Sequence, residues 1–212
     1  TPDAFTFGSR NDVELSSVEI SPTLTISGFQ VDIPVTVTGG EYSIACNPAN
    51  FTSTPGVISP DQTICLRHTS ANNYASDTST QLTIGGVSGS FVTTTKDDIT
   101  PDSFSFTPLT NVDLSTPQTS NSVTISGISS SVNISASGGS YSIGCNGSFI
   151  NTAATINNGQ NVCVQHMSSA DNNATTQTTL TVGDASANFS STTMADTTPN
   201  NFTSPADIAL KK

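Results

Sequence analysis

Apolar and polar residues alternate with a period of two along most of this chain, and the spacing of an amphipathic helix is nearly absent. In the first half of the chain, glycines separate the alternating segments and predict turns between them. Short alternating strands that each bury one face predict an all-β sandwich. The predicted strands are Ala4–Phe7, Val13–Leu15, Thr23–Ser27, Ile33–Thr38, Tyr42–Cys46, Gln62–His68, Thr80–Ile84 and Ser88–Thr94.

The sequence repeats. The opening Thr1-Pro-Asp-Ala-Phe5 returns as Thr100-Pro-Asp-Ser-Phe104 and again as Thr198-Pro-Asn-Asn-Phe202, at intervals of 99 and 98 residues. Inside the first two copies, further segments recur in the same order: Thr25-Ile-Ser-Gly28 with Thr124-Ile-Ser-Gly127, Gly39-Gly40 with Gly138-Gly139, Tyr42-Ser-Ile44 with Tyr141-Ser-Ile143, Cys65-Leu-Arg-His68 with Cys163-Val-Gln-His166, and Leu82-Thr-Ile-Gly85 with Leu180-Thr-Val-Gly183. A repeat of about 100 residues is the size of a complete domain. We therefore expect one domain over residues 1–98, a second over 99–197 and a partial third repeat over 198–212.

Seven or eight short strands in a domain of this size are typical of an Ig-like β-sandwich. Alternation places Ile64, Leu66 and His68 on one face of a strand and Cys65 on the opposite face. A disulfide from Cys65 is therefore not expected to be the buried bridge between sheets that antibody domains contain. We expect it at a strand edge, where it would hold a loop.

The four cysteines divide equally between the repeats, with Cys46 and Cys65 in the first and Cys145 and Cys163 in the second. This arrangement predicts one disulfide per domain and an oxidising, extracellular compartment. Closing a loop of this length stabilises a domain by roughly 3 kcal/mol in the chain-entropy model. A metal site built from Cys46, Cys65 and His68 is the alternative, but it lacks a Cys-x-x-Cys motif and a fourth ligand.

Charge excludes several classes of partner. The net charge is −11, and the basic residues number five: Arg10, Arg67, Lys96, Lys211 and Lys212. No basic stripe can neutralise phosphates, so nucleic acid and anionic membrane surfaces are not expected partners. No apolar segment approaches the roughly 18 residues that a membrane span requires. Only 33% of residues are hydrophobic, which indicates narrow cores between Ser/Thr-rich outer faces.

Asp97, Asp98 and Asp102 gather where the first repeat meets the second. Calcium bound between domains is one interpretation, and a solvated acidic linker is the other. The corresponding segment near residue 196 keeps only Asp196, and no complete calcium-loop motif is present. We expect no other cofactor.

No catalytic residues are expected. His68 and His166 occupy the same position in the two repeats, with no neighbouring nucleophile motif, so we expect a structural role such as hydrogen bonding to a nearby loop. The acidic residues are scattered, and Trp is absent, which disfavours glycoside chemistry and sugar stacking. Glycosylation sequons begin at Asn50, Asn133, Asn146, Asn173, Asn188 and Asn201, about as many as chance gives in so Ser/Thr-rich a chain.

The segments TPDAFTF, TISG, GGEYSI, CLRHTS and LTIGG together resemble the tandem Ig-like repeats of large bacterial secreted and cell-surface proteins. The resemblance covers both repeats and the start of the third. It implies an extracellular, non-enzymatic β-sandwich module of an adhesin, stalk or filament, and it brings no catalytic residues.

The partial third repeat carries Phe202, Ile208 and Leu210 where the second repeat has Phe104, Val112 and Leu114. An isolated strand with an apolar face is not stable in water. We expect it to complete a sheet in another copy of the chain, which would build a pilus-like surface filament from identical subunits. The alternative is a stalk of a large adhesin, in which this segment contacts neighbouring repeats of the same protein. A carbohydrate- or calcium-binding surface module is a further alternative.

Overall fold

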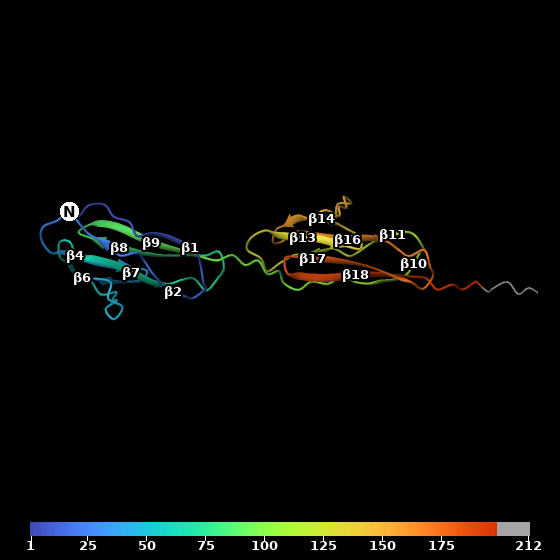
Figure 1. Cartoon of the computed structure of the whole chain (residues 1–212), viewed down its shortest axis with the longest axis horizontal. Helices are drawn as coiled ribbons and strands as arrows, with labels where there is room; N and C mark the ends of the chain where they lie inside the picture. Colours follow the sequence, from blue (N-terminus) through green and yellow to red (C-terminus); the bar gives the residue numbers. More distant parts are fainter. Residues whose placement is uncertain (199–212) are drawn as a thin grey trace, which may run out of the picture. The chain divides into compact units, whose positions relative to one another are not determined.

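The computed structural model describes residues 1–198, which contain eighteen β-strands and no helix (Figure 1). The described chain forms two compact units. The first unit comprises residues 1–99 and 127–130, and the second comprises 100–126 and the described residues from 131 onward. The prediction of an all-β fold with tandem Ig-like sandwiches is confirmed.

The first unit packs two sheets against each other. One sheet has the strand order β1-β9-β8-β4-β6, and in the other β7 lies between the short strands β2 and β3 on one side and β5 on the other. The strands are β1 (Gly8–Val13), β2 (Val18–Ile20), β3 (Leu24–Thr25), β4 (Ile33–Thr38), β5 (Glu41–Ile44), β6 (Gly56–Ile58), β7 (Thr63–Thr69), β8 (Asp77–Ile84) and β9 (Val87–Thr95).

The second unit repeats this topology, with sheets β10-β18-β17-β13-β15 and β11-β16-β12, where β14 also pairs with β16. Its strands are β10 (Leu109–Val112), β11 (Pro117–Thr119), β12 (Val123–Thr124), β13 (Val132–Ser137), β14 (Ser140–Ile143), β15 (Ala154–Ile156), β16 (Asn161–Met167), β17 (Thr175–Val182) and β18 (Ala185–Thr193).

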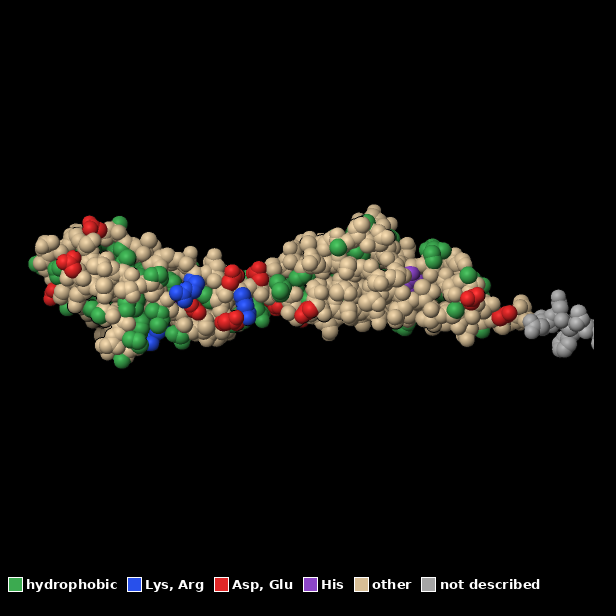
Figure 2. Space-filling model, viewed as in Figure 1, with side chains coloured by type: hydrophobic (Ala, Val, Ile, Leu, Met, Phe, Trp, Pro, Cys, Tyr) green, Lys and Arg blue, Asp and Glu red, His purple; other side chains and the backbone are tan. Residues whose placement is uncertain are grey.

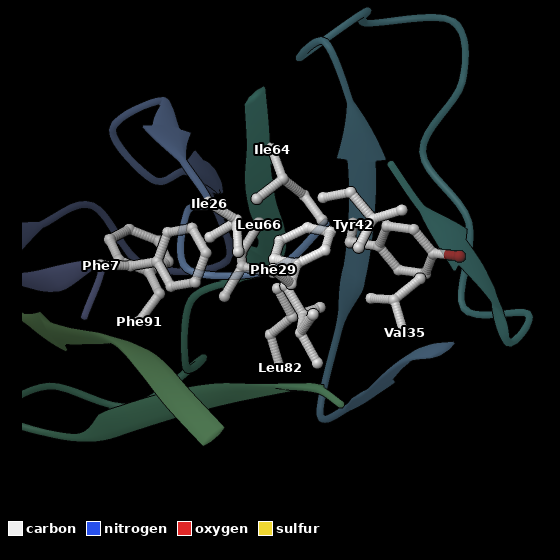
Figure 3. Packing of buried hydrophobic residues seen from close by; sticks show 11 residues of the cluster. Phe7, Ile26, Phe29, Val35, Tyr42, Ile64, Leu66, Leu82 and Phe91 are labelled. Atoms are coloured by element: carbon white, nitrogen blue, oxygen red, sulfur yellow. The ribbon is translucent and has the colours of Figure 1, made fainter. Parts of the chain in front are cut away.

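The core of the first unit lies between the inward faces of its sheets. Figure 3 shows a continuous row of buried side chains, with Phe7 and Phe91 at one end and Tyr42 at the other. Ile64 and Leu66 of β7 are completely buried in this row, as their alternation predicts. Each fully buried aliphatic or aromatic side chain contributes about 1.5–3 kcal/mol.

The chain departs from the predicted strands at four places. Residues Ala4–Phe7 form no β-ladder. Phe7 donates its backbone N–H to the Ser90 carbonyl, whereas Asp3 donates to the Ser27 carbonyl in a different segment. The strand predicted at Val13–Leu15 ends at Val13 and begins earlier, at Gly8. The short strands β2 and β6 were not predicted, and Gly56, which predicted a turn, begins β6. A Cβ at Gly56 would lie 2.6 Å from the Tyr42 hydroxyl, so the glycine serves close packing.

Candidate interaction surfaces and the buried histidines

The repeated opening segment is an integral part of each sandwich. The Asp3 amide donates to the Ser27 carbonyl at 2.9 Å, and the Ser27 hydroxyl donates to the Asp3 carboxylate at 3.0 Å. A Cβ at Gly28, which has a φ of +86°, would lie 2.6 Å from the Asp3 nitrogen. Asp102 and Ser126 form the same pair of bonds in the second repeat. Two motifs that recur separately in the sequence therefore recur because they contact each other.

After this contact, each opening segment continues as a strand parallel to the last strand of its own sandwich, β1 beside β9 and β10 beside β18. Both ladders shift register just before Val13 and Val112. The residue before each valine, Asp12 or Asn111, has a φ of +56°. Asp and Asn tolerate this left-handed conformation better than other non-glycine residues. The bulge therefore has a sequence signature, an Asp or Asn directly before an apolar residue.

His68 lies inside the first sandwich and connects its two sheets. It extends from β7, where only 6% of it is exposed, toward β8 and β9 of the facing sheet. Its Nδ1 lies 2.8 Å from the Thr80 hydroxyl, and its Nε2 lies 2.8 Å from the Thr93 hydroxyl. The ring stacks on Phe91 with centroids 5.0 Å apart. The expected structural role thus involves the opposite sheet, whereas the sequence suggested a neighbouring loop.

The surrounding hydroxyls define the protonation of the ring. Thr80 donates its only hydroxyl proton to the Gly39 carbonyl at 3.0 Å, so it can only accept from His68. Nδ1 must therefore carry the ring proton, and Nε2 accepts from Thr93. A second proton on Nε2 would oppose the Thr93 donor. Burial lowers the pKa of His68, and the nearby Glu19 carboxylate opposes this shift.

The second repeat builds the same arrangement around His166. Thr178 lies 2.8 Å from Nδ1 and itself donates to the Gly138 carbonyl, while Ser191 lies 2.7 Å from Nε2. The ring contacts Phe189 at 4.9 Å between centroids, and burial lowers the pKa of His166. Serine replaces threonine at one partner, so the hydroxyl is what the two repeats share.

Acidification from about pH 7.5 to 5 is expected to destabilise both repeats. An unfolded chain binds the proton with the ordinary histidine pKa near 6.5, whereas the folded pKa lies lower. The stabilisation is therefore complete above about pH 6.5 and is lost as the pH falls toward the folded pKa, by at most about 1.4 kcal/mol per pH unit and histidine. Melting temperatures measured across this range test the expectation. His166→Phe retains a ring but cannot titrate, so an unchanged pH profile of the second repeat in that variant would contradict it.

Each repeat contains one disulfide, Cys46–Cys65 and Cys145–Cys163, with Cα atoms 5.4 and 5.3 Å apart. Each bond joins the turn after one strand to the adjacent strand of the same sheet, β5 to β7 or β14 to β16. The bridge is not between sheets, and it holds the loop that follows Cys46 or Cys145. Cys65 is nevertheless only 1% exposed, whereas Cys46 is partly exposed, so the bond is covered at its β7 end.

The loop after each disulfide returns over the outer face of the sheet. In the first repeat, the Arg67 guanidinium stacks on Phe51 at 4.2 Å and forms an ion pair with Glu41. The second repeat has Phe149 with the uncharged Gln165 and Ser140 at the corresponding positions. Equivalent shallow hollows of about 480 and 580 Å³ lie beside these residues. The same hollow therefore has a charged border in one repeat and an uncharged border in the other.

The outer edge formed by β2 differs between the repeats. Val18 and Ile20 are 64% and 39% exposed, although both are apolar. At the corresponding positions of β11, the second repeat has Pro117 and Thr119. The difference was not predicted, although aligning the repeats at an offset of 99 residues pairs Val18 with Pro117.

Figure 2 shows a surface made mostly of uncharged polar side chains and backbone, and the basic side chains visible there lie on the first unit. Within residues 1–198, no group of three or more His, Cys, Asp or Glu residues is placed to hold a metal ion. Asp102 accepts from Ser126, and Asp97 lies 3.5 Å from the Ser129 hydroxyl. Calcium binding by Asp97, Asp98 and Asp102 stays a prediction.

The predicted polymerisation residues Phe202, Ile208 and Leu210 lie outside the described residues. The described part of the chain contains no helix long and apolar enough to cross a membrane.

Comparison with known proteins finds no matching protein-family model and no matching curated protein. Among solved structures, an I-band fragment of titin is similar over 92% of this chain, at 10% identity and a TM-score of 0.37. The chain spans 65% of the length of that fragment. A second titin fragment matches 90% of this chain and 98% of its own length, at 8% identity and a TM-score of 0.36. The multicopper oxidase Fet3p matches 98% of this chain and 51% of its own length, at 11% identity and a TM-score of 0.27. Likeness at this level carries no argument about function.

Proposed function

We propose that this protein is a non-enzymatic structural subunit of an extracellular surface filament, which polymerises head-to-tail through residues 198–212. The observation that carries the proposal is the third copy of the opening segment. In both complete repeats, that segment contributes a strand to a β-sandwich. A third copy therefore has the sequence of a strand that belongs to a sandwich.

The third copy keeps the signature of the bulge. Asp207 precedes Ile208 and Leu210 follows, as Asp12 precedes Val13 and Leu15 follows in the first repeat. The second repeat has Asn111, Val112 and Leu114 in this pattern. An Asp or Asn tolerates the left-handed conformation that the bulge requires. The segment therefore keeps the residue type of the bulge as well as the apolar residues that follow it.

Within residues 1–198, both sandwiches already contain their own opening strand, β1 beside β9 and β10 beside β18. Residues 198–212 are therefore an additional copy of this strand beyond those two sandwiches. A domain of a neighbouring copy would give it a place to pair, and repeated use of the same contact between copies builds a fibre.

The remaining structure supports a structural and extracellular role. Each repeat has a disulfide, which is typical of proteins in oxidising compartments. Both histidines are engaged on each ring nitrogen by buried hydroxyls inside the sandwiches. That arrangement supports a role for them in stability.

Electron microscopy and light scattering test the proposal on the intact chain and on a chain truncated after Asp196. We expect regular fibres from the intact chain and monomers from the truncated one. The truncated chain should keep the two thermal transitions of the intact chain, which shows that both sandwiches still fold. Monomers in both samples would contradict the filament.

A stalk of tandem repeats is the second candidate function. It is favoured by the same bulge signature, since a segment that matches β1 so closely could open a third sandwich of the same array. In a stalk, the repeats hold a distant binding domain away from a surface and need no self-association. Absence of polymerisation at every concentration would favour this function.

A further inference from the structure

We propose that the outer edge of β2 in the first repeat accepts residues 206–210 of a neighbouring copy as an added antiparallel strand. The inference rests on the proposed filament function and names its accepting surface. The same fold presents different edges at β2 and at β11.

Backbone hydrogen bonds show which groups of β2 face outward. The Ser70 amide donates to the Ser17 carbonyl at 2.8 Å, and the Ser21 amide donates to the Leu66 carbonyl at 2.9 Å. In an antiparallel ladder, bonded pairs alternate with pairs that are not bonded to each other. Val18 and Ile20 therefore direct their amides and carbonyls away from β7. The Ile20 carbonyl accepts from Arg10 at 3.2 Å, which leaves the amide and carbonyl of Val18 and the amide of Ile20 along the outer edge of β2.

The same bonds recur in the second repeat, from Ser168 to Thr116 and from Ser120 to Val164. There the outward position that corresponds to Val18 is Pro117, which has no N–H to offer. Proline on an edge strand is a common protection against pairing with another chain. The second repeat thus protects this edge, and the first repeat leaves it able to pair.

Side chains on the two edges differ in the same direction. Val18 and Ile20 present an exposed apolar surface, whereas Pro117 is followed by Gln118 and Thr119. In residues 206–210, Ile208 and Leu210 lie two residues apart after Asp207, which places them on one face of an extended strand. Pairing that face with Val18 and Ile20 would cover apolar groups on both strands.

Charge favours this occupant. Residues 1–98 contain ten acidic and three basic residues, whereas residues 198–212 contain Asp207 and two lysines. An antiparallel strand would bring Lys211 and Lys212 to the N-terminal end of β2. Glu14 lies at that end, where its carbonyl accepts from Ser17, and its side chain is 70% exposed and pairs with Lys96 at 2.6 Å. The excess of acidic residues in the first repeat as a whole, and not a vacant carboxylate at this end, therefore attracts the lysines.

The position occupied by β1 is a poorer acceptor. In the first repeat β1 already pairs with β9, and Phe7 of the same segment is only 4% exposed in the core. A neighbouring strand would have to expel these residues before it could bind there. Addition at β2 displaces no strand and no core side chain, and within residues 1–198 only the Arg10 contact with the Ile20 carbonyl lies on this edge.

The test exchanges the edges of the two repeats in the full-length chain. Val18→Pro with Ile20→Thr gives β2 the residues of β11, and position 18 tolerates proline because the same fold holds Pro117. Pro117→Val with Thr119→Ile is the matched control in the second repeat. Sedimentation velocity over a concentration series is expected to show at least tenfold weaker association for the first variant. The control is expected to associate at least as strongly as the natural chain.

Three outcomes are distinguishable. Loss of association in the first variant, with both thermal transitions intact, supports the assignment. Undiminished association would overturn β2 as the acceptor but leave the filament in place. A natural chain that never associates would overturn both. Hydrogen exchange on assembled natural chain gives an independent answer if the variant folds poorly, since the Val18 and Ile20 amides must become protected on assembly. Unprotected amides would overturn the assignment.

Discussion

Replacement of His68 by alanine is expected to lower the unfolding free energy of the first repeat by about 3–5 kcal/mol, as truncation of a buried ring does in other cores. The variant loses the stack on Phe91 and leaves the Thr93 hydroxyl, which is 1% exposed, without its ring partner. A buried hydroxyl without a partner costs about 1–3 kcal/mol. Calorimetry of the full chain should show one transition shifted down and the other in place.

His166→Ala is the matched variant, and it should shift the other transition, that of the second repeat. A double variant, His68→Leu with Thr93→Val, removes the polar groups on both sides of the contact at similar volume. It should recover part of the stability lost by His68→Ala. A decrease below about 1 kcal/mol for His68→Ala would show that the hydrogen bonds between the sheets contribute little.

Removal of the first disulfide through Cys46→Ala with Cys65→Ala is expected to cost about 3 kcal/mol, because the unfolded chain regains the freedom of the closed loop. Cys65 is 1% exposed, so its replacement also leaves a small gap under the loop. Chemical denaturation of the natural chain and the variant under oxidising conditions measures the difference. The second repeat, with Cys145–Cys163 intact, provides the internal reference.

Reducing agent should remove the part of the difference that comes from the bond and leave only the smaller cost of the gap at Cys65. A variant as stable as the natural chain under oxidising conditions would mean that the loop is equally ordered without the bond. Such a result would indicate that the stacking of Arg67 on Phe51 is what orders the loop.

Local pattern predicted which face each side chain takes. Alternation put Ile64, Leu66 and His68 together, and all three are buried. It also put Cys65 on the other face, where the disulfide lies within one sheet. These predictions succeed because the period of a strand depends only on the backbone.

Contacts between the sheets could not be predicted in this way. Thr80 and Thr93 lie 12 and 25 residues beyond His68 in sequence, on the facing sheet. These threonines lie near His68 because β4 pairs in one sheet and the next strand, β5, pairs with β7 in the other. Alternation along the sequence does not specify which strands pair. The bulge at Asp12 likewise depends on pairing between the first and last strands of a sandwich. The difference between Val18 and Pro117 is visible when the repeats are aligned. Its effect on pairing with another strand could not be predicted, because that depends on whether the backbone amide at this position points toward β7 or away from it.

The parallel pairing of β1 with β9 has a mechanical consequence. A pull on both ends of a repeat acts on the start of β1 and on the finish of β9, so the two strands are drawn past each other along their length. Their hydrogen bonds then share the tension in shear and cannot open one at a time. If a repeat does yield, each disulfide withholds from the extended chain the segment between its cysteines, which are 19 positions apart in the first repeat and 18 in the second. Each repeat would therefore lengthen less than its residue count allows, and the withheld segment would help it refold when the tension is released.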